Sequence, residues 1–263
     1  MSVYKILFLD IDGTILTPDD LIEESTKEAV KQIKQKGLEV FLATGRPLHE
    51  IQEIGEELKI ESFIGYNGAY AIHKGRDVFN EPVEATVVDR FLNTMKSRGH
   101  EGVLYTNGQN LLTNSEAPIV KRFVEHFHLR HNEEYKDTFK QDILGISIMN
   151  ISKEEVHLYE EEGVIHLSPI NVSEFKEHSY DVIRDKVNKG FAVQKVLDLL
   201  NIDKESAIAF GDGMNDKEML KLVGNGFAMG NAQEELFQYA DHQTTDVTNS
   251  GVFNGLKALG LVK

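Results

Sequence analysis

The chain has 263 residues, of which 41% are hydrophobic and 27% are charged, a composition typical of a soluble protein with one large domain or two modest ones. Lys and Arg number 28 against 43 Asp and Glu, which gives a formal charge of -15. This acidic balance argues against nucleic acid or an anionic membrane as the main partner. Cysteine is absent, which excludes disulfide bonds, thiolate metal sites and a cysteine nucleophile.

The first apolar run, residues 6–9, is too short for a signal sequence or a membrane span. We therefore expect a cytoplasmic protein with no membrane partner. The sequence does not indicate an oligomeric state, and a monomer is slightly favoured.

Strands and helices alternate in the N-terminal part of the chain. In order, the apolar spacing predicts a strand over residues 6–9, a helix over 22–36, a strand over 38–43, a helix after Pro47 and a strand over 62–66. The same alternation returns late in the chain, with a helix over 190–200, a strand over 207–210, a helix over 216–223 and a strand over 226–229. Such alternation is typical of a parallel sheet with helices on its faces.

The middle of the chain, residues 83–184, shows mixed and more widely separated elements. Strands are predicted near 103–105, 143–149, 164–167 and 180–183, and helices near 85–98, 116–127 and 153–162. A parallel-sheet pattern that stops and resumes is most simply an interrupted one. We therefore predict an α/β protein: a Rossmann-like parallel-sheet core made of 1–82 and 185–263, with helices on both faces, and an inserted α+β domain over 83–184.

Asp10 and Asp12 stand at the end of the first predicted strand. Side chains alternate along a strand, so two carboxylates two residues apart can lie on one side where the chain leaves the sheet. Asp12 followed by Gly13 is also ordinary turn chemistry, but a carboxylate that closes an apolar run, as Asp10 does, needs a partner or a metal. The pair suits a magnesium ion and an attacking carboxylate.

Two further segments, Thr44-Gly45-Arg46-Pro47 and Lys189-Gly190, each precede a predicted helix. The Thr44 hydroxyl and free backbone N–H groups would face a bound anion, and Lys189 could reach phosphate oxygens and a nearby carboxylate. Each segment also has an ordinary explanation: a helix cap for Thr44, and a solvated loop lysine for Lys189.

A fourth segment, Gly211-Asp212-Gly213-Met214-Asn215-Asp216, brackets a carboxylate with glycines at the end of a predicted strand. Asp216 also fits as a negative charge at the start of a helix, whereas Asp212 lacks that explanation. All four segments follow predicted strands, and the binding crevice of an open parallel sheet lies at the carboxyl ends of its strands. We therefore expect these distant segments to converge.

With these motifs the chain resembles the haloacid dehalogenase-like hydrolases, and among them the Cof-type phosphatases with a large α/β cap (type IIB). The matching residues are Asp10-x-Asp12-Gly13-Thr14, Thr44-Gly45-Arg46, Asn67-Gly68-Ala69, Lys189-Gly190, Gly211-Asp212-Gly213-Met214-Asn215-Asp216 and Ala228-Met229-Gly230-Asn231-Ala232. They cover both halves of the predicted core. In residues 83–184, the expected cap, the resemblance rests on length and placement alone.

The resemblance also implies a role for each site residue. Asp10 would be the nucleophile that forms an aspartyl-phosphate, and Asp12 the general acid and base. Mg2+ would be held by Asp10, the backbone carbonyl of Asp12, and Asp212. The phosphoryl oxygens would be bound by Thr44, the N–H groups of Ile11 and Gly45, Lys189 and Asn215. Asp216 and Arg46 would support the site by orienting Asn215 or Lys189.

The activity implied is that of a Mg2+-dependent phosphatase acting on small phosphorylated metabolites, with sugar phosphates favoured. Two alternatives stay open from the sequence: a phosphosugar mutase, whose cap would hold a bisphosphate intermediate, and a non-catalytic metabolite-binding protein on the same scaffold. Degenerate binders usually lack a member of the catalytic set. Here Asp10, Asp12, Thr44, Lys189 and Asp212 are all present.

Overall fold

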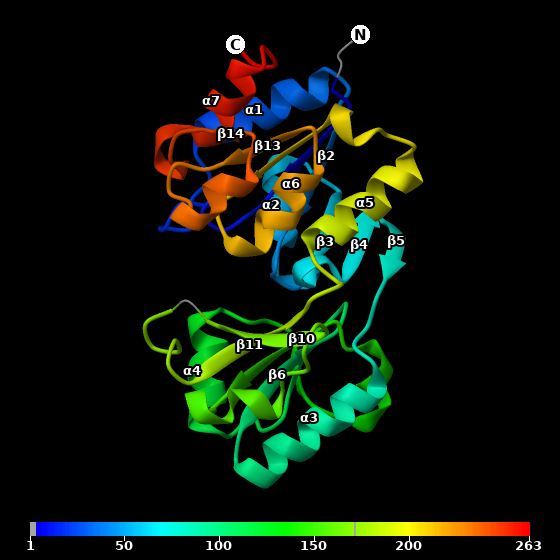
Figure 1. The fold of residues 1–263 in the computed structure, drawn as a ribbon, viewed down its shortest axis with the longest axis vertical. Helices are drawn as coiled ribbons and strands as arrows, with labels where there is room; N and C mark the ends of the chain where they lie inside the picture. Colours follow the sequence, from blue (N-terminus) through cyan, green and yellow to red (C-terminus); the bar gives the residue numbers. More distant parts are fainter. Residues whose placement is uncertain (1–3, 171) are drawn as a thin grey trace. The chain divides into compact units, whose positions relative to one another are not determined.

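A computed structural model describes residues 4–170 and 172–263 (Figure 1). The chain divides into two compact units. The first contains the described residues up to Arg46, residues 51–79 and residues 188–263; the second contains Pro47–Glu50 and residues 80–187. The domain ranges expected from the sequence placed the junctions at 82/83 and 184/185 and kept Pro47–Glu50 in the first domain. They also included residues 1–3 and 171, which lie outside the described residues.

The first unit is built on an eight-stranded sheet with the order β14-β13-β12-β1-β2-β3-β4-β5. Its strands are β1 (Ile6–Leu9), β2 (Glu39–Ala43), β3 (Ser62–Gly65), β4 (Tyr70–His73), β5 (Arg76–Asn80), β12 (Ala207–Gly211), β13 (Asn225–Ala228) and β14 (His242–Gln243). The central strand β1 pairs in parallel with β12 and with β2, so that Ile6 is opposite both Ala207 and Glu39. Every residue of β1 is buried, because helices cover both faces of a parallel sheet.

The helices of this unit are α1 (Glu24–Gln35), α2 (Gln52–Leu58), α5 (Lys189–Leu200), α6 (Lys217–Leu222) and α7 (Gly251–Ala258). On one face, α5 and α6 contribute Val193, Val196 and Leu220 to a core with alternate sheet residues such as Phe8 and Phe41. The α1 helix packs beside α7 and α2, and it buries the apolar stripe that its spacing predicted. The α/β fold predicted from the sequence, a parallel-rich sheet with helices, is confirmed.

The second unit contains a six-stranded sheet with the order β10-β11-β9-β6-β7-β8. Its strands are β6 (Glu101–Tyr105), β7 (Asn110–Leu112), β8 (Asn132–Glu134), β9 (Gly145–Met149), β10 (Ile165–Pro169) and β11 (Ser179–Arg184), and its helices are α3 (Ala85–Arg98) and α4 (Pro118–His126). Pairing is antiparallel except between β7 and β8. Phe91 of α3 and Phe123 of α4 belong to separate hydrophobic cores.

Short 3-10 helices occupy Leu48–Glu50, Tyr66–Gly68, Asp137–Asp142, Lys153–Leu158, Lys204–Ser206, Met214–Asp216, Glu234–Tyr239 and Val247–Asn249. The helix expected over 153–162 is therefore wrong in type and length. A capping box between Ser152 and Glu155 starts the segment. It ends at Leu158 because the chain turns just afterwards, where Glu161 pairs with Ile165 in an isolated bridge. Among the described residues, no helix is long and apolar enough to cross a membrane.

Candidate active site

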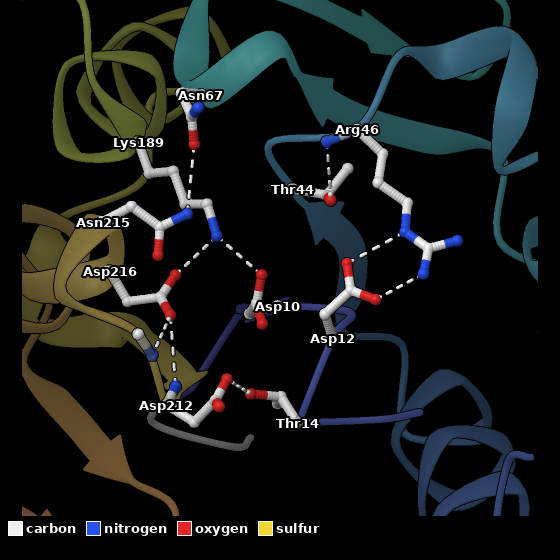
Figure 2. A network of polar contacts seen from close by, with 11 residues as sticks. Asp10, Asp12, Thr14, Thr44, Arg46, Asn67, Lys189, Asp212, Asn215 and Asp216 are labelled. Carbon is white, nitrogen blue, oxygen red and sulfur yellow. Dashed lines mark hydrogen bonds and ion pairs between the residues drawn. The ribbon is translucent and has the colours of Figure 1, made fainter. Parts of the chain in front are cut away.

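Four segments of the first unit meet where its strands end (Figure 2). Asp10 follows β1, Thr44 follows β2, Asn67 lies just after β3, and Asp212 follows β12. The strands β12, β1, β2 and β3 are neighbours and parallel, so their carboxyl ends share one edge of the sheet. This is the edge at which open α/β sheets bind ligands.

Asp10 and Lys189 form the buried centre of the site. The Lys189 ammonium donates to Asp10 Oδ1 at 2.6 Å and to Asp216 Oδ1 at 2.6 Å. Lys189, the first residue of α5, is fully buried, so it is not a solvated loop lysine. Burial alone would lower the pKa of Lys189, but the carboxylates of Asp10 and Asp216 outweigh it and raise that pKa. The ammonium therefore stays charged at neutral pH.

Three carboxylates crowd this centre. Burial first, and then the charges of Asp216 and Asp212, hold the pKa of Asp10 well above its usual range, although Lys189 opposes them. Burial and the Asp216 charge raise the pKa of Asp212 to about 7. The cluster of Asp10, Asp212 and Asp216 places one carboxylate oxygen from each within 4.8 Å of the others. One ammonium group therefore does not balance the negative charge gathered here.

This excess of carboxylate oxygen fits a hard divalent cation. Asp216 is already committed, because its Oδ1 accepts from Lys189 and its Oδ2 accepts from the backbone N–H groups of Asp212 and Gly213 at 3.1 Å. Asp10 and Asp212 are thus the side chains left to hold a cation. Their pKa values are raised by burial first and then by the charge of Asp216, so a cation placed between them would favour their ionised forms.

Gly13 and its neighbours shape the wall beside Asp212. A Cβ atom built on Gly13 would lie 2.2 Å from Asp212 Oδ2, and its φ is +79°, so a larger residue would displace the carboxylate. Thr14 Oγ1 donates to Asp212 Oδ1 at 3.3 Å. Asn231 Nδ2 donates to the Gly13 carbonyl at 2.8 Å and approaches Asp212 Oδ2 at 3.4 Å.

Asp12 lies at the exposed side of the site and is held by Arg46. Arg46 Nε donates to Asp12 Oδ2 at 2.9 Å while its Nη2 donates to Oδ1, a two-point contact that fixes the plane of the carboxylate. Arg46 Nη2 also lies 3.9 Å from Asp20 Oδ1. Arg46 was expected to orient Lys189 or Asn215, and these contacts give it a different neighbour, Asp12.

The remaining predicted residues line the same edge. Thr44 is buried, and its Oγ1 accepts from the backbone N–H of Arg46 at 3.0 Å, which leaves its hydroxyl proton for another acceptor. Gly45 follows Thr44, and Ile11 lies between Asp10 and Asp12. Asn215 Nδ2 donates to Asn67 Oδ1 at 3.1 Å.

The sequence predicts no role for Asn67, Thr14 or Asn231, although all three stand in motifs typical of the family. The sequence does contain a pattern that marks two of them. Asn67 and Asn231 follow strands β3 and β13, at the same edge of the sheet as Asp10 and Asp212. A polar residue just after each parallel strand is the pattern that would have found them.

Comparison with known proteins identifies the family to which this chain belongs. A protein-family model that describes the haloacid dehalogenase-like hydrolases matches residues 7–256. The chain belongs to this family of hydrolases. It is similar to the putative phosphatase YkrA of Bacillus subtilis (strain 168), with 32% identity over 98% of this chain and 99% of that protein. The resemblance to the Cof-type phosphatases of this haloacid dehalogenase-like family, and with it the assignment of the chain as an enzyme of the phosphatase type, is confirmed.

Solved structures agree on the fold. A hypothetical protein from Geobacillus kaustophilus HTA426 superposes with a TM-score of 0.89 at 30% identity, covering 98% of this chain and 100% of that one. The haloacid dehalogenase subclass IIB sugar phosphatase BT4131 superposes with a TM-score of 0.82 at 24% identity, covering 98% and 100%. Phosphatases of this family generally use a divalent metal, and a cluster of acidic side chains, Asp10, Asp212 and Asp216, is present in this chain.

Proposed function

We propose that this haloacid dehalogenase-like hydrolase is a Mg2+-dependent phosphatase that cleaves small phosphorylated metabolites through a phosphoryl group carried on Asp10. The observation that carries the proposal is the contact of a buried carboxylate, Asp10, with a buried ammonium, Lys189, at 2.6 Å. An isolated nucleophilic carboxylate would repel a phosphate dianion. The lysine supplies opposing charge at the point of attack, and phosphoryl transfer depends mainly on positioning and charge stabilisation.

In the first step a carboxylate oxygen of Asp10 attacks phosphorus. The bond from phosphorus to Asp10 forms while the bond from phosphorus to the ester oxygen breaks, and Asp12 gives its proton to the departing oxygen. The Asp12 side chain is 54% exposed and therefore open to the leaving group. Its two-point contact with Arg46 suits the ionised carboxylate of the second step, so in the first step the proton on Asp12 replaces one of these two hydrogen bonds.

In the second step Asp12, now a carboxylate, takes a proton from water. The water oxygen attacks phosphorus, the bond from phosphorus to Asp10 breaks, and inorganic phosphate leaves. Thr44, the N–H groups of Ile11 and Gly45, Lys189 and Asn215 are proposed to bind the phosphoryl oxygens in both steps. Asp216 supports this set by holding Lys189 at 2.6 Å.

Asp10, Asp212 and the backbone carbonyl of Asp12 are proposed to hold Mg2+, which when bound neutralises charge on the phosphoryl oxygens. Mg2+ suits a site with few protein ligands because it keeps several of its waters. The protein's own part is to supply two ionised carboxylates, one of which is also the nucleophile.

Sugar phosphates are the proposed substrates. Support comes from a likeness along 98% of this chain, the second unit included, to a protein named as a sugar phosphatase. The second unit, residues 80–187 with Pro47–Glu50, is proposed as the cap that selects the leaving group, since specificity is not carried by the fold.

The phosphoryl-enzyme tests this proposal most specifically. Borohydride reduces an acyl phosphate to an alcohol, so enzyme quenched during turnover should yield homoserine at position 10, detectable by peptide mass spectrometry. Asp212→Asn, which retains Asp10, serves as the control that should accumulate little of this product. Homoserine at another aspartate, or at none while phosphate is released, would overturn the assignment of Asp10.

A further inference from the structure

We propose that Asn67 is a positioning residue of the phosphate site, which fixes the side-chain amide of Asn215 so that its second N–H points at a phosphoryl oxygen. This inference rests on the proposed function, which places Asn215 among the phosphate ligands. Asn67 itself would act through Asn215.

The contact that suggests this role joins two segments far apart in sequence. Asn215 Nδ2 donates to Asn67 Oδ1 at 3.1 Å (Figure 2). An amide nitrogen carries two N–H groups, so one remains available after this bond. On the other side of the amide, a Cβ atom built on Gly213 would lie only 2.6 Å from Asn215 Oδ1. The Asn215 amide thus lies close to the backbone of Gly213 and is hydrogen-bonded to Asn67.

The backbone at Asn67 is itself unusual. Tyr66 has a φ of +54° and Asn67 a φ of +53°, two successive residues other than glycine in the left-handed region. Such conformations cost free energy and persist only where the surroundings determine them, most often at functional sites. Strand β4 begins at Tyr70, so these two residues lie in the turn between β3 and β4.

Hydrogen bonds and close packing hold the turn in place. The Asn67 N–H donates to the Thr44 carbonyl at 3.1 Å, and the Tyr66 N–H donates to the Arg46 carbonyl at 3.3 Å. Gly68 packs closely against the start of α5, since a Cβ atom built on Gly68 would lie 2.2 Å from the Asn188 carbonyl oxygen. The turn is therefore fixed between the segment that carries Thr44 and the helix that begins with Lys189.

Gly45 provides the space that Asn67 occupies. A Cβ atom built on Gly45 would lie 2.9 Å from Asn67 Oδ1 and 3.2 Å from Asn67 Nδ2. Gly45 is not among the residues with positive φ, so close approach rather than backbone conformation requires glycine here. Because Gly45 has no side chain, the Asn67 amide has room to lie beside Gly45.

The functional consequence is preorganisation. Asn215 is an exposed residue at a 3-10 helix, and a free side chain of this kind loses rotamer entropy when it binds a ligand. The contact with Asn67 removes that freedom before phosphate arrives. Loss of Asn67 should therefore weaken phosphate binding about as much as loss of the Asn215 amide itself.

The test compares Asn67→Gly, Asn215→Ala and the double variant in their affinity for inorganic phosphate, measured by calorimetry with Mg2+, beside KM and kcat for one phosphate ester. Glycine accepts the positive φ, so Asn67→Gly removes the amide without backbone strain. Asn201→Gly is the matched control, because Asn201 also has a positive φ, +51°, at the end of α5 and away from the site.

We expect Asn67→Gly to weaken phosphate affinity by about five- to twenty-fold, with a rise in KM and an unchanged midpoint of thermal unfolding, and Asn201→Gly to match the wild type. The double variant should be no weaker than Asn215→Ala alone, because the two residues act as one unit. Unchanged affinity in Asn67→Gly, or additive losses in the double variant, would overturn the inference while leaving the proposed function intact. A wild type that releases no phosphate yet binds it with this coupling would overturn the function alone, and one that neither binds nor releases phosphate would overturn both.

Discussion

At the scale of single residues, the site gathers three carboxylates around one ammonium group. Asp10 and Asp212 both have raised pKa values, mainly because they are buried and secondly because of Asp216. Lys189 is the buried cation that holds Asp10 and Asp216 together. A divalent cation held by Asp10 and Asp212 would reduce the repulsion among these carboxylates. Its binding would therefore stabilise the folded protein.

The first prediction concerns pH and metal. The pKa of Asp212 is about 7 in the folded protein and about 3.9 in an unfolded chain, so between these values the folded state binds more protons. The free energy of unfolding of the metal-free protein should therefore fall as pH rises through this range. Because a cation binds the ionised carboxylates, the rise in Tm caused by saturating Mg2+ should be larger at about pH 8 than at about pH 5.5.

Thermal unfolding at the two pH values, with Mg2+ and with EDTA, measures this directly. Asp212→Asn is the control, because it removes the titrating group and should reduce the difference. A rise in Tm that is equal at both pH values would show that Asp212 does not bind the cation.

The second prediction concerns the buried lysine. Lys189→Met keeps much of the side-chain volume but leaves Asp10 and Asp216 without their cation, and removal of one partner from a buried ion pair typically costs about 3–5 kcal/mol. Urea unfolding near neutral pH should show a loss of this size, together with weaker binding of inorganic phosphate. Lys195→Met, at an exposed position on the same helix, should cost less than about 1 kcal/mol. Equal losses in the two variants would mean that Lys189 does not hold the carboxylates together.

At the scale of elements, the alternating pattern of the sequence was sufficient to predict the parallel part of the sheet. Strands such as β1 and β12 are buried on both faces and therefore appear as continuous apolar runs. The helix expected over 190–200 is α5, Lys189–Leu200. The site followed from the same pattern, because motifs at the ends of adjacent parallel strands must converge.

The elements that escaped prediction lack such a pattern. The strands β4 and β5 extend the sheet beyond β3, with β4 antiparallel to it. The five residues of β5 are mostly exposed or partly exposed, so no apolar periodicity marks them. Asn67 lies in the turn between β3 and β4. Its role depends on a contact with Asn215 that no local sequence pattern encodes.

The third prediction concerns this turn. Gly68 has a φ of +99° and Gly75 a φ of +75°, but a Cβ atom meets the Asn188 carbonyl at Gly68 and nothing within 4 Å at Gly75. Gly75→Ala should therefore cost only the conformational penalty, about 1 kcal/mol. Gly68→Ala should cost at least about 2 kcal/mol more, because it displaces backbone at the start of α5.

Urea unfolding of the two variants provides the comparison, and phosphate binding by Gly68→Ala should weaken because Lys189 begins α5. An equal loss of unfolding free energy in both variants would show that the packing of Gly68 against Asn188 does not stabilise the start of α5.

At the scale of the whole molecule, two facts frame the proposed reaction. The chain carries a formal charge of -15, so an anionic substrate is repelled at long range and must be attracted locally, by Lys189 and a bound cation. The second unit has hydrophobic cores of its own around Phe91 and Phe123. It therefore has the packing of an independent folding unit, as an inserted domain needs.

The measurement that tests the central claim most directly is phosphate release from a panel of phosphorylated metabolites, by wild type and by Asp10→Asn, with Mg2+ and with EDTA. Asn has nearly the shape of Asp but is not a nucleophile. Because Lys189 keeps Asp216 as its counter-ion, Asp10→Asn should stay folded. We expect release by the wild type with Mg2+, strongest for sugar phosphates, and loss of at least about a thousandfold in activity in EDTA or in Asp10→Asn. Substantial release by folded Asp10→Asn would contradict the claim that Asp10 carries the phosphoryl group.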